Sequence, residues 1–337
     1  MQRRGEAVRA SALYEVVKMS PGVTDPEHRP VMVQEVLRFL RCEQGATIVD
    51  ATLGLGGHAR AILEKIRPGG LLIGIDRDRE SLEIARLRLA EYAGSTRLFH
   101  DNFKNLPLVL NNLGARRVDG ILLDLGVSSY QLLSPERGFS FQSDAMLDMR
   151  MDQSQRLTAA DLVNDLPEDQ LADVIFRYGE ERFARRIAAA IAAERRHGRI
   201  TRSSQLSQIV SRAVNVRGYQ RIHAATRTFQ ALRIAVNREL EGLEEFLQNA
   251  VSFIKPGARI VVISFHSLED RIVKTAFRRL SGQCICDRPP ELCKCSREVL
   301  VRVMTRRPAT PGAAELAANP RARSARLRAA EKIGDQV

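Results

Sequence analysis

The sequence has no tryptophan, and aromatic residues make up only 5% of its 337 residues. It has no apolar run long enough to span a bilayer and no apolar stretch typical of a signal peptide near its start. The Arg3-Arg4 pair is followed by no hydrophobic region, so it does not resemble an export signal. We therefore expect a cytoplasmic protein without membrane segments, with residues 1–27 as a flexible, polar and charged N-terminal tail.

Cysteine is scarce, and four of the five cysteines lie close together. Cys42 is isolated and expected to be buried, whereas Cys284-x-Cys286 and Cys293-x-Cys295 share one short loop. Four thiolates at such spacing can bind zinc, but C-x-C is tighter than the usual C-x₂-C knuckle. Disulfides are disfavoured in a reducing cytosol. The pattern leaves zinc open and favours a cysteine-rich surface loop, so no metal site is predicted.

Acidic residues are too few to balance the basic ones, which leaves a net charge of +12 and a pI near 10. A basic excess of this size favours a polyanionic partner, because each neutralised phosphate releases counterions. The alternative is an arginine-rich surface that only keeps the protein soluble. The arginine clusters lie late in the chain and favour a nucleic-acid surface; they are at 182–186, 195–197, 217–227 and 302–328.

The segment 48–58 contains an apolar strand that ends in Asp50 and runs into a glycine-rich turn and a helix. Backbone at such a turn can approach a nucleotide-like cofactor closely, and the helix start offers free N–H groups. The pattern Gly54-x-Gly56-x-x-Ala59 also fits dinucleotide binding, so a nicotinamide dehydrogenase is an alternative. A carboxylate beside a pyrophosphate is unfavourable, and Asp50 therefore favours a cationic ligand such as S-adenosylmethionine.

Further strands at 71–76, 97–100, 119–124 and 259–265 alternate with helices, which predicts an α/β fold with a doubly wound, mostly parallel sheet. Asp76 and Asp124 end two of these strands. Asp76 lies about 20 residues beyond the glycine turn, where a carboxylate binds ribose hydroxyls, although it also suits a helix N-cap. Phe103 is interpreted as an adenine contact or as part of the core.

A long gap separates the fourth and fifth strands, and its pattern is helical over 159–162, 167–178, 180–196 and 203–214. We expect residues 136–225 to form an inserted helical substrate-recognition domain, and 28–135 with 226–337 to form the main domain. One long helix is predicted over 232–254, and 299–304 with 325–332 are predicted as a final pair of strands. His266 and Ser267 follow the fifth strand as substrate contacts, with Ser267 alternatively the N-cap of the next helix.

Together these segments resemble the bacterial RsmH (MraW) family over nearly the whole chain from His28 onward. The motifs that carry the resemblance are 28–32, 52–58, 120–129, 136–141, 147–151, 178–182, 225–233, 263–271 and 319–324. The resemblance implies a class I S-adenosylmethionine-dependent methyltransferase with a Rossmann-like fold. Its implied substrate is the N4 amine of a cytosine in 16S rRNA of the small ribosomal subunit, near the decoding centre. A homodimer is left open.

The resemblance also implies the site residues. The cofactor-binding residues would be Gly56, Gly57, His58, Asp76, Phe103, Asp124 and Gln131. Asp124 is the first candidate for the catalytic proton acceptor, with His266 or Ser264 as second choices. The segment Asp124-Leu125-Gly126-Val127 departs from the Asp/Asn-Pro-Pro-aromatic motif of many amino-group methyltransferases. A small-molecule methyltransferase and a non-catalytic RNA-binding factor are the remaining alternatives.

Overall fold

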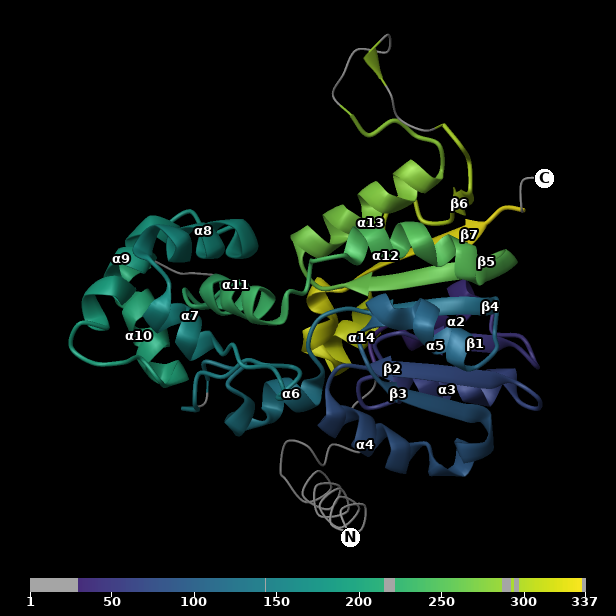
Figure 1. The fold of residues 1–337 in the computed structure, drawn as a ribbon, viewed down its shortest axis with the longest axis horizontal. Helices are drawn as coiled ribbons and strands as arrows, with labels where there is room; N and C mark the ends of the chain where they lie inside the picture. The colour runs from purple at the N-terminus through teal and green to yellow at the C-terminus, as the bar shows by residue number, and fades with distance from the viewer. Residues whose placement is uncertain (1–29, 143, 215–221, 287–291, 294–296, 335–337) are drawn as a thin grey trace. The chain divides into compact units, whose positions relative to one another are not determined.

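The structure, a computed structural model, describes residues 30–142, 144–214, 222–286, 292–293 and 297–334 (Figure 1). The chain divides into two compact units, one formed by Met1–Gly126 with Leu240–Val337 and the other by Val127–Glu239. Within the described ranges, no helix combines the length and the apolar character needed to cross a membrane. The predicted tail at 1–27 lies outside the described residues.

The first unit is built on a seven-stranded sheet with the order β3-β2-β1-β4-β5-β7-β6. The first five strands in this order pair in parallel, and β7 pairs antiparallel with both β5 and β6. This confirms the doubly wound, mostly parallel sheet and its closing antiparallel pair. The strands are β1 Thr47–Asp50, β2 Leu71–Asp76, β3 Thr96–His100, β4 Val118–Asp124, β5 Ile254–Ser264, β6 Val301–Val303 and β7 Arg326–Lys332.

Each central strand buries both of its faces, because successive side chains alternate between two helix layers. In β1, Val49 packs with one cluster of buried residues and Ile48 with the other. The first cluster includes side chains of α5 (Leu106–Asn112), α12 (Leu243–Ala250) and α13 (Ser267–Leu280). The second includes those of α2 (Val33–Leu40), α3 (Gly57–Ile66) and α4 (Arg79–Arg88). Because both faces of these strands are buried, their sequences are continuously apolar, as in residues 71–75.

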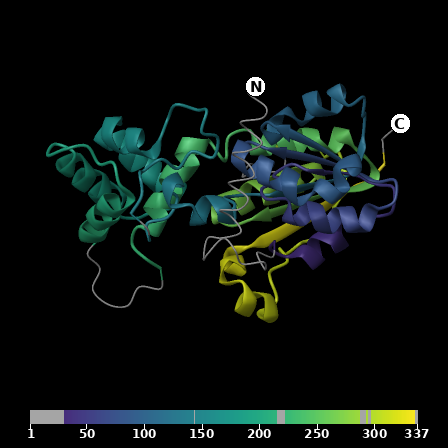
Figure 2. The ribbon, with the colours of Figure 1, turned by 90° about the horizontal axis from the view of Figure 1, so that it is seen from below.

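The second unit consists of helices, with no strand among its described residues (Figure 2). Its helices are α6 Ser129–Leu133, α7 Ala159–Asp165, α8 Glu168–Gly179, α9 Ala184–Glu194, α10 Ser203–Val214 and α11 Thr226–Asn237. Their apolar faces form one core of their own. The four predicted helical segments correspond to α7 through α10. The unit extends beyond the predicted insert 136–225 on both sides.

The single helix predicted over 232–254 is wrong, because the chain forms two helices there, α11 and α12. Arg238 has φ 49° and Gly242 has φ 69°, and these left-handed residues break the helical path. Buried Asn237 anchors the end of α11 within the second unit, donating to Met149 O at 2.7 Å and accepting from Met151 N at 2.7 Å. The apolar period continues across the break, so periodicity alone does not reveal it.

Asp270 of α13 joins that helix to β7 through ion pairs with arginines. Its carboxylate accepts from Arg328 Nε at 2.6 Å and from Arg328 Nη2 at 3.1 Å, and Arg326 adds a contact at 3.2 Å. Burial alone would raise the pKa of Asp270, but the hydrogen bonds and charges of Arg328 and Arg326 outweigh it and hold the pKa below its usual range. The contribution of this pair to stability is therefore present at neutral pH and is lost as the pH falls through the lowered pKa.

We expect Asp270→Ala to lower the free energy of unfolding by about 3–5 kcal/mol, because it leaves the buried Arg328 guanidinium without its partner. Chemical denaturation at neutral pH measures the change. Glu64→Ala is the control, since Glu64 of α3 pairs with Arg60 at 3.5 Å on the exposed surface and should change stability by about 1 kcal/mol or less. Equal losses in the two variants would contradict the assignment.

Candidate functional site

Three carboxylates end three adjacent strands of the sheet at its carboxyl edge. Asp76 ends β2, Asp50 ends β1 and Asp124 ends β4. The strand order reverses between β1 and β4, which is the topological switch point where open α/β sheets bind their ligands. The sequence predicted this convergence from the strand ends, and the sheet order places the three residues on neighbouring strands.

The glycine-rich turn after β1 is tied to both neighbouring strands by short hydrogen bonds. Gly54 N donates to Asp76 Oδ2 at 2.6 Å, and Asp124 N donates to Thr52 Oγ1 at 2.6 Å. Gly54 and Gly56 have φ angles of 52° and 79°, a region that glycine enters at little cost. The turn is therefore held in one shape by the strand ends beside it.

Contacts within the protein itself favour glycine at positions 56 and 57. A Cβ on Gly56 would lie 3.2 Å from a methyl carbon of Leu89, on a backbone with positive φ. A Cβ on Gly57 would lie 3.0 Å from the ring of Pro30. Glycine is thus favoured at position 56 by the backbone conformation and by packing, and at position 57 by packing alone. Their cofactor contacts, which the family resemblance implies, stay predictions.

Asp76 is not a helix N-cap. The N-cap of α4 is Asp78, whose side chain accepts from Glu80 N and Ser81 N. Asp76 accepts instead from Gly54 N and, at 2.8 Å, from Asp78 N. Burial raises its pKa to about 6, against these backbone hydrogen bonds, which lower it. The structure thus removes the capping alternative and places Asp76 directly beside the glycine turn.

His58 is buried in the first turn of α3 and lies between the backbone and Asp124. Its Nε2 is 2.8 Å from Val31 O, and its Nδ1 is 3.4 Å from Asp124 Oδ2. A carbonyl oxygen only accepts, so we assign the ring proton to Nε2, which leaves Nδ1 as an acceptor facing Asp124. Burial lowers the pKa of His58, although the nearby Asp50 opposes that shift, so the ring is neutral.

Asp124 has one carboxylate oxygen without a partner. Its Oδ1 is buried and accepts no hydrogen bond from any described residue. Burial, followed by the negative charge of Glu269, raises the pKa of Asp124 to about 7. Burial also raises the pKa of Asp50 to about 7, partly opposed by His58. Carboxyl groups that titrate near neutral pH in one cluster are typical of functional sites.

The second-choice acceptors, Ser264 and His266, both have partners. The Ser264 hydroxyl at the end of β5 donates to Arg326 O at 3.3 Å. His266 is the N-cap of α13 and shares a capping box with Glu269, whose Oε2 also accepts from Phe265 N at 2.9 Å. The alternative that Ser267 caps this helix is therefore wrong, since Ser267 is its first helical residue. His266 Nε2 is also buried without a hydrogen bond, but it lies 3.2 Å from the Glu269 carboxylate, whereas Asp124 Oδ1 has no described partner.

The two remaining site residues make structural contacts. The Phe103 ring packs edge-on against Phe246, with the ring centroids 4.9 Å apart, and it therefore packs against the hydrophobic core, as one of its two interpretations predicted. Gln131 belongs to the second unit, where it is buried and closes a capping box with Ser128 at the start of α6. A contact of either residue with a cofactor stays a prediction.

Asp50 and Glu269 belong to this edge of the sheet, although neither was among the predicted site residues. Asp50 is only 1% exposed, and the charges of Asp76 and Asp124 both raise its pKa further. The sequence feature that could have identified Asp50 as a site residue was its position at the end of β1. Glu269 had a weaker signal, because the spacing His266-x-x-Glu269 fits a capping box whose first residue is normally serine or threonine.

Comparisons with known proteins agree on one family. The model of the MraW methylase family matches residues 25–333. The ribosomal RNA small subunit methyltransferase H of Geobacter sulfurreducens is 55% identical over 307 residues, covering 91% of this chain and 99% of that protein. The protein of the same name from Halothermothrix orenii is 47% identical over 310 residues, again covering 91% of this chain and 99% of the relative.

A third relative, from Geotalea uraniireducens and also named ribosomal RNA small subunit methyltransferase H, is 53% identical and matches along 92% of this chain and 100% of its own length. The predicted family is thereby confirmed, and a nicotinamide dehydrogenase is excluded. The sheet order and the carboxylate edge described above are those of a doubly wound, Rossmann-like fold. The chain belongs to the MraW methylase family.

Proposed function

We propose that this chain transfers a methyl group from S-adenosylmethionine to the N4 amine of one cytosine in small-subunit (16S) rRNA, near the decoding centre. The names of the relatives supply the substrate class. The observation that carries the chemistry is the buried Asp124 Oδ1, which has no described partner at the switch point of the sheet. A carboxylate there is suited to accept a proton from an exocyclic amine.

The carboxyl edge fits the proposed cofactor. The turn 52–57 would lie against the ligand, and its free helix-start N–H groups would face it together with Asp76. Asp50, Asp76 and Asp124 together supply the negative charge that favours a ligand carrying amino and sulfonium cations. When bound, S-adenosylmethionine supplies a methyl group on a positively charged sulfur. Asp124 Oδ1, which accepts no hydrogen bond from the described residues, would gain a partner when ligands are bound.

Asp124 acts in this proposal as the proton acceptor. Cytosine N4 is a weak nucleophile, because its lone pair is delocalised into the ring. Positive charge would develop on N4 as it receives the methyl group, and Asp124 Oδ1 would accept the proton that N4 loses. The other Asp124 oxygen, Oδ2, lies 3.4 Å from His58 Nδ1. A base must be unpaired or extruded for N4 to reach this edge.

The second unit offers basic side chains for the RNA backbone. Arg182, Arg185 and Arg186, at the start of α9 and just before it, are exposed, and none of them forms an ion pair with another described residue. In contrast, Arg199 is paired with Asp165 at 2.9 Å. Exposed guanidinium groups without carboxylate partners are suited to phosphate contacts. The predicted cluster at 217–227 lies partly outside the described residues.

We expect Asp76→Asn to weaken S-adenosylmethionine binding by about 10- to 100-fold, because a hydrogen bond to a charged carboxylate contributes about 1.5–3 kcal/mol. Isothermal titration calorimetry measures the change. Asp78→Asn is the matched control: it removes the same charge two residues away but retains a good N-cap for α4. An unchanged dissociation constant in Asp76→Asn would refute the ribose assignment.

The same binding should depend on pH. As the pH falls, the carboxylates become protonated, because the pKa is about 7 for Asp124 and Asp50 and about 6 for Asp76. The site then loses the negative charge that attracts a cationic ligand, so the affinity should decrease on acidification. The Asp76→Asn variant should lack the part of this decrease that lies near pH 6. An affinity independent of pH would contradict the electrostatic account.

The proposed substrate is tested by mass spectrometry of small-subunit rRNA from cells with and without the gene. One N4-methylcytosine should disappear on deletion and return with the wild-type gene. Asp124→Asn should restore little of it, since loss of a proton acceptor lowers turnover by about 100-fold or more. Full modification by Asp124→Asn would refute the acceptor role. An rRNA unchanged by the deletion would refute the function and leave a small-molecule methyltransferase or an RNA-binding factor.

Arg186→Ala should weaken RNA binding and make it less sensitive to salt. Each lost phosphate contact lowers the slope of log K against log salt by about 0.7–0.9. Arg199→Ala removes the same charge from the same unit, but its guanidinium is already engaged by Asp165. A smaller slope in Arg186→Ala only is the expected result in fluorescence anisotropy titrations. Identical slopes in the two variants would mean that general charge, and not this surface, binds the RNA.

A further inference from the structure

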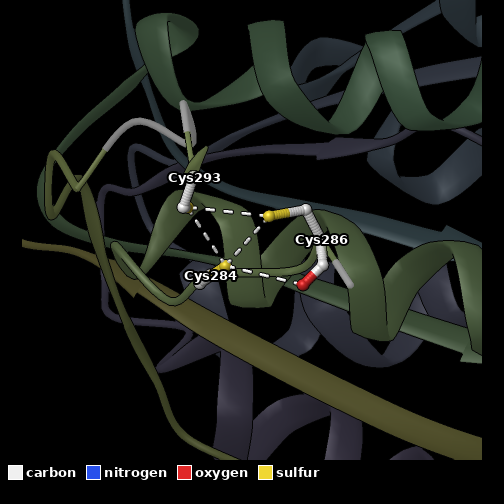
Figure 3. A group of neighbouring side chains, drawn as sticks. All are labelled: Cys284, Cys286 and Cys293. Carbon is white, nitrogen blue, oxygen red and sulfur yellow. Dashed lines mark hydrogen bonds between the residues drawn. The ribbon is translucent and has the colours of Figure 1, made fainter. Parts of the chain in front are cut away.

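Three cysteine side chains converge in the loop between α13 and β6 (Figure 3). The Sγ atom of Cys284 lies 3.4 Å from that of Cys286 and 3.4 Å from that of Cys293, and the third side of the triangle is 3.6 Å. Cys284 is exposed and the other two are partly buried. These sulfur atoms form a nearly equilateral triangle at the surface, outside the two hydrophobic cores of the first unit.

The dimensions of this triangle match one face of a tetrahedral zinc site. With zinc–sulfur bonds of about 2.3 Å and angles of about 109°, two thiolates bound to the same ion lie about 3.8 Å apart. The observed separations are within a few tenths of an ångström of that value. A disulfide joins only two sulfurs, at about 2.05 Å, and leaves the third unpaired. Three mutual contacts are therefore better explained by a shared ligand.

The fold brings these residues together from both sides of the loop. Ser281 and Val299 form an antiparallel bridge, and Leu300 N donates to Leu280 O at 2.8 Å, which closes the base of the loop. Cys284 and Cys286 leave this base on one side, and Cys293 faces them from the returning side. Arg278 Nη2 of α13 donates to the backbone oxygen of Cys284 at 3.4 Å and ties the start of the loop to that helix.

Cys42, which lies outside this loop, differs from the three loop cysteines in burial and surroundings. Burial raises the pKa of the Cys42 thiol to about 12, so it stays protonated and is a poor metal ligand. No other described cysteine lies within bonding distance of it, whereas the three loop thiols are close to one another and accessible to an ion.

We propose that Cys284, Cys286 and Cys293 bind one Zn²⁺ as a structural site that clamps the loop between α13 and β6. The three thiolates occupy three positions of a tetrahedron, and the fourth is left to a ligand that these residues do not supply. Cys295 lies outside the described residues and is not part of the proposed site. The site is separate from the carboxylate edge, and the proposal does not depend on the proposed methyl transfer.

The test uses the full-length protein, purified under anaerobic reducing conditions and reconstituted with zinc alone. Elemental analysis after gel filtration should find about one zinc per chain, as expected of a single structural site. Competition with a chromogenic chelator then gives the affinity. Cobalt substitution should produce the visible absorption of tetrahedral thiolate coordination, which is a readout independent of activity.

Cys284→Ser and Cys293→Ser should each lower zinc affinity by about 100-fold or more, since even outer-shell losses lower it by about 10–100-fold. Cys42→Ser is the matched control and should retain the wild-type affinity. Circular dichroism confirms that the variants fold. Absence of stoichiometric zinc in the reconstituted wild-type protein, or equal binding by Cys284→Ser and wild type, would overturn the proposal. So would a disulfide among the three cysteines that persists in the reduced, zinc-loaded protein.

Discussion

Asp50, Asp76 and Asp124 are carboxylates placed where the sheet excludes most water, and the rest of the site follows from that placement. Loss of hydration disfavours their charge and raises each pKa toward neutrality. Backbone N–H groups partly compensate, and the glycine turn adopts its shape by supplying one of them to Asp76. A cationic ligand would compensate the remaining negative charge, which is the physical reason for proposing that S-adenosylmethionine binds at this edge.

The fold that supports these carboxylates is also stabilised by paired charges elsewhere. Asp270 and Glu331 are each held by two arginines, and both have a lowered pKa because these partners outweigh the effect of burial. Asp124 differs from them: Asp270 is paired with arginine, whereas one carboxylate oxygen of Asp124 has no described partner. Asp270 and Glu331 thus have cationic partners, whereas the proposed proton acceptor lies beside a neutral histidine.

Much of the fold and part of the site were predictable from residues close together in the sequence. The strands, the four insert helices and the closing antiparallel pair were found because burial on two faces or on one stripe leaves a local period. Asp76 and Asp124 were found because strand ends converge in parallel sheets. The helix break near Arg238 was missed, since the apolar period continues across it while the two helices pack in different units.

The sequence by itself determined the family, the parallel sheet and the chemical types at its carboxyl edge, because each depends on residue order and spacing. Only the tertiary structure decided which of those groups has a partner. It showed that Ser264 and His266 are engaged, that Asp124 keeps an oxygen without a described partner, and that three loop thiols meet at one point. Hydrogen-bond partners such as Ser264 and Arg326 are distant in sequence, and the distances between the three thiols depend on the path of the loop, so this geometry exists only after the chain has folded.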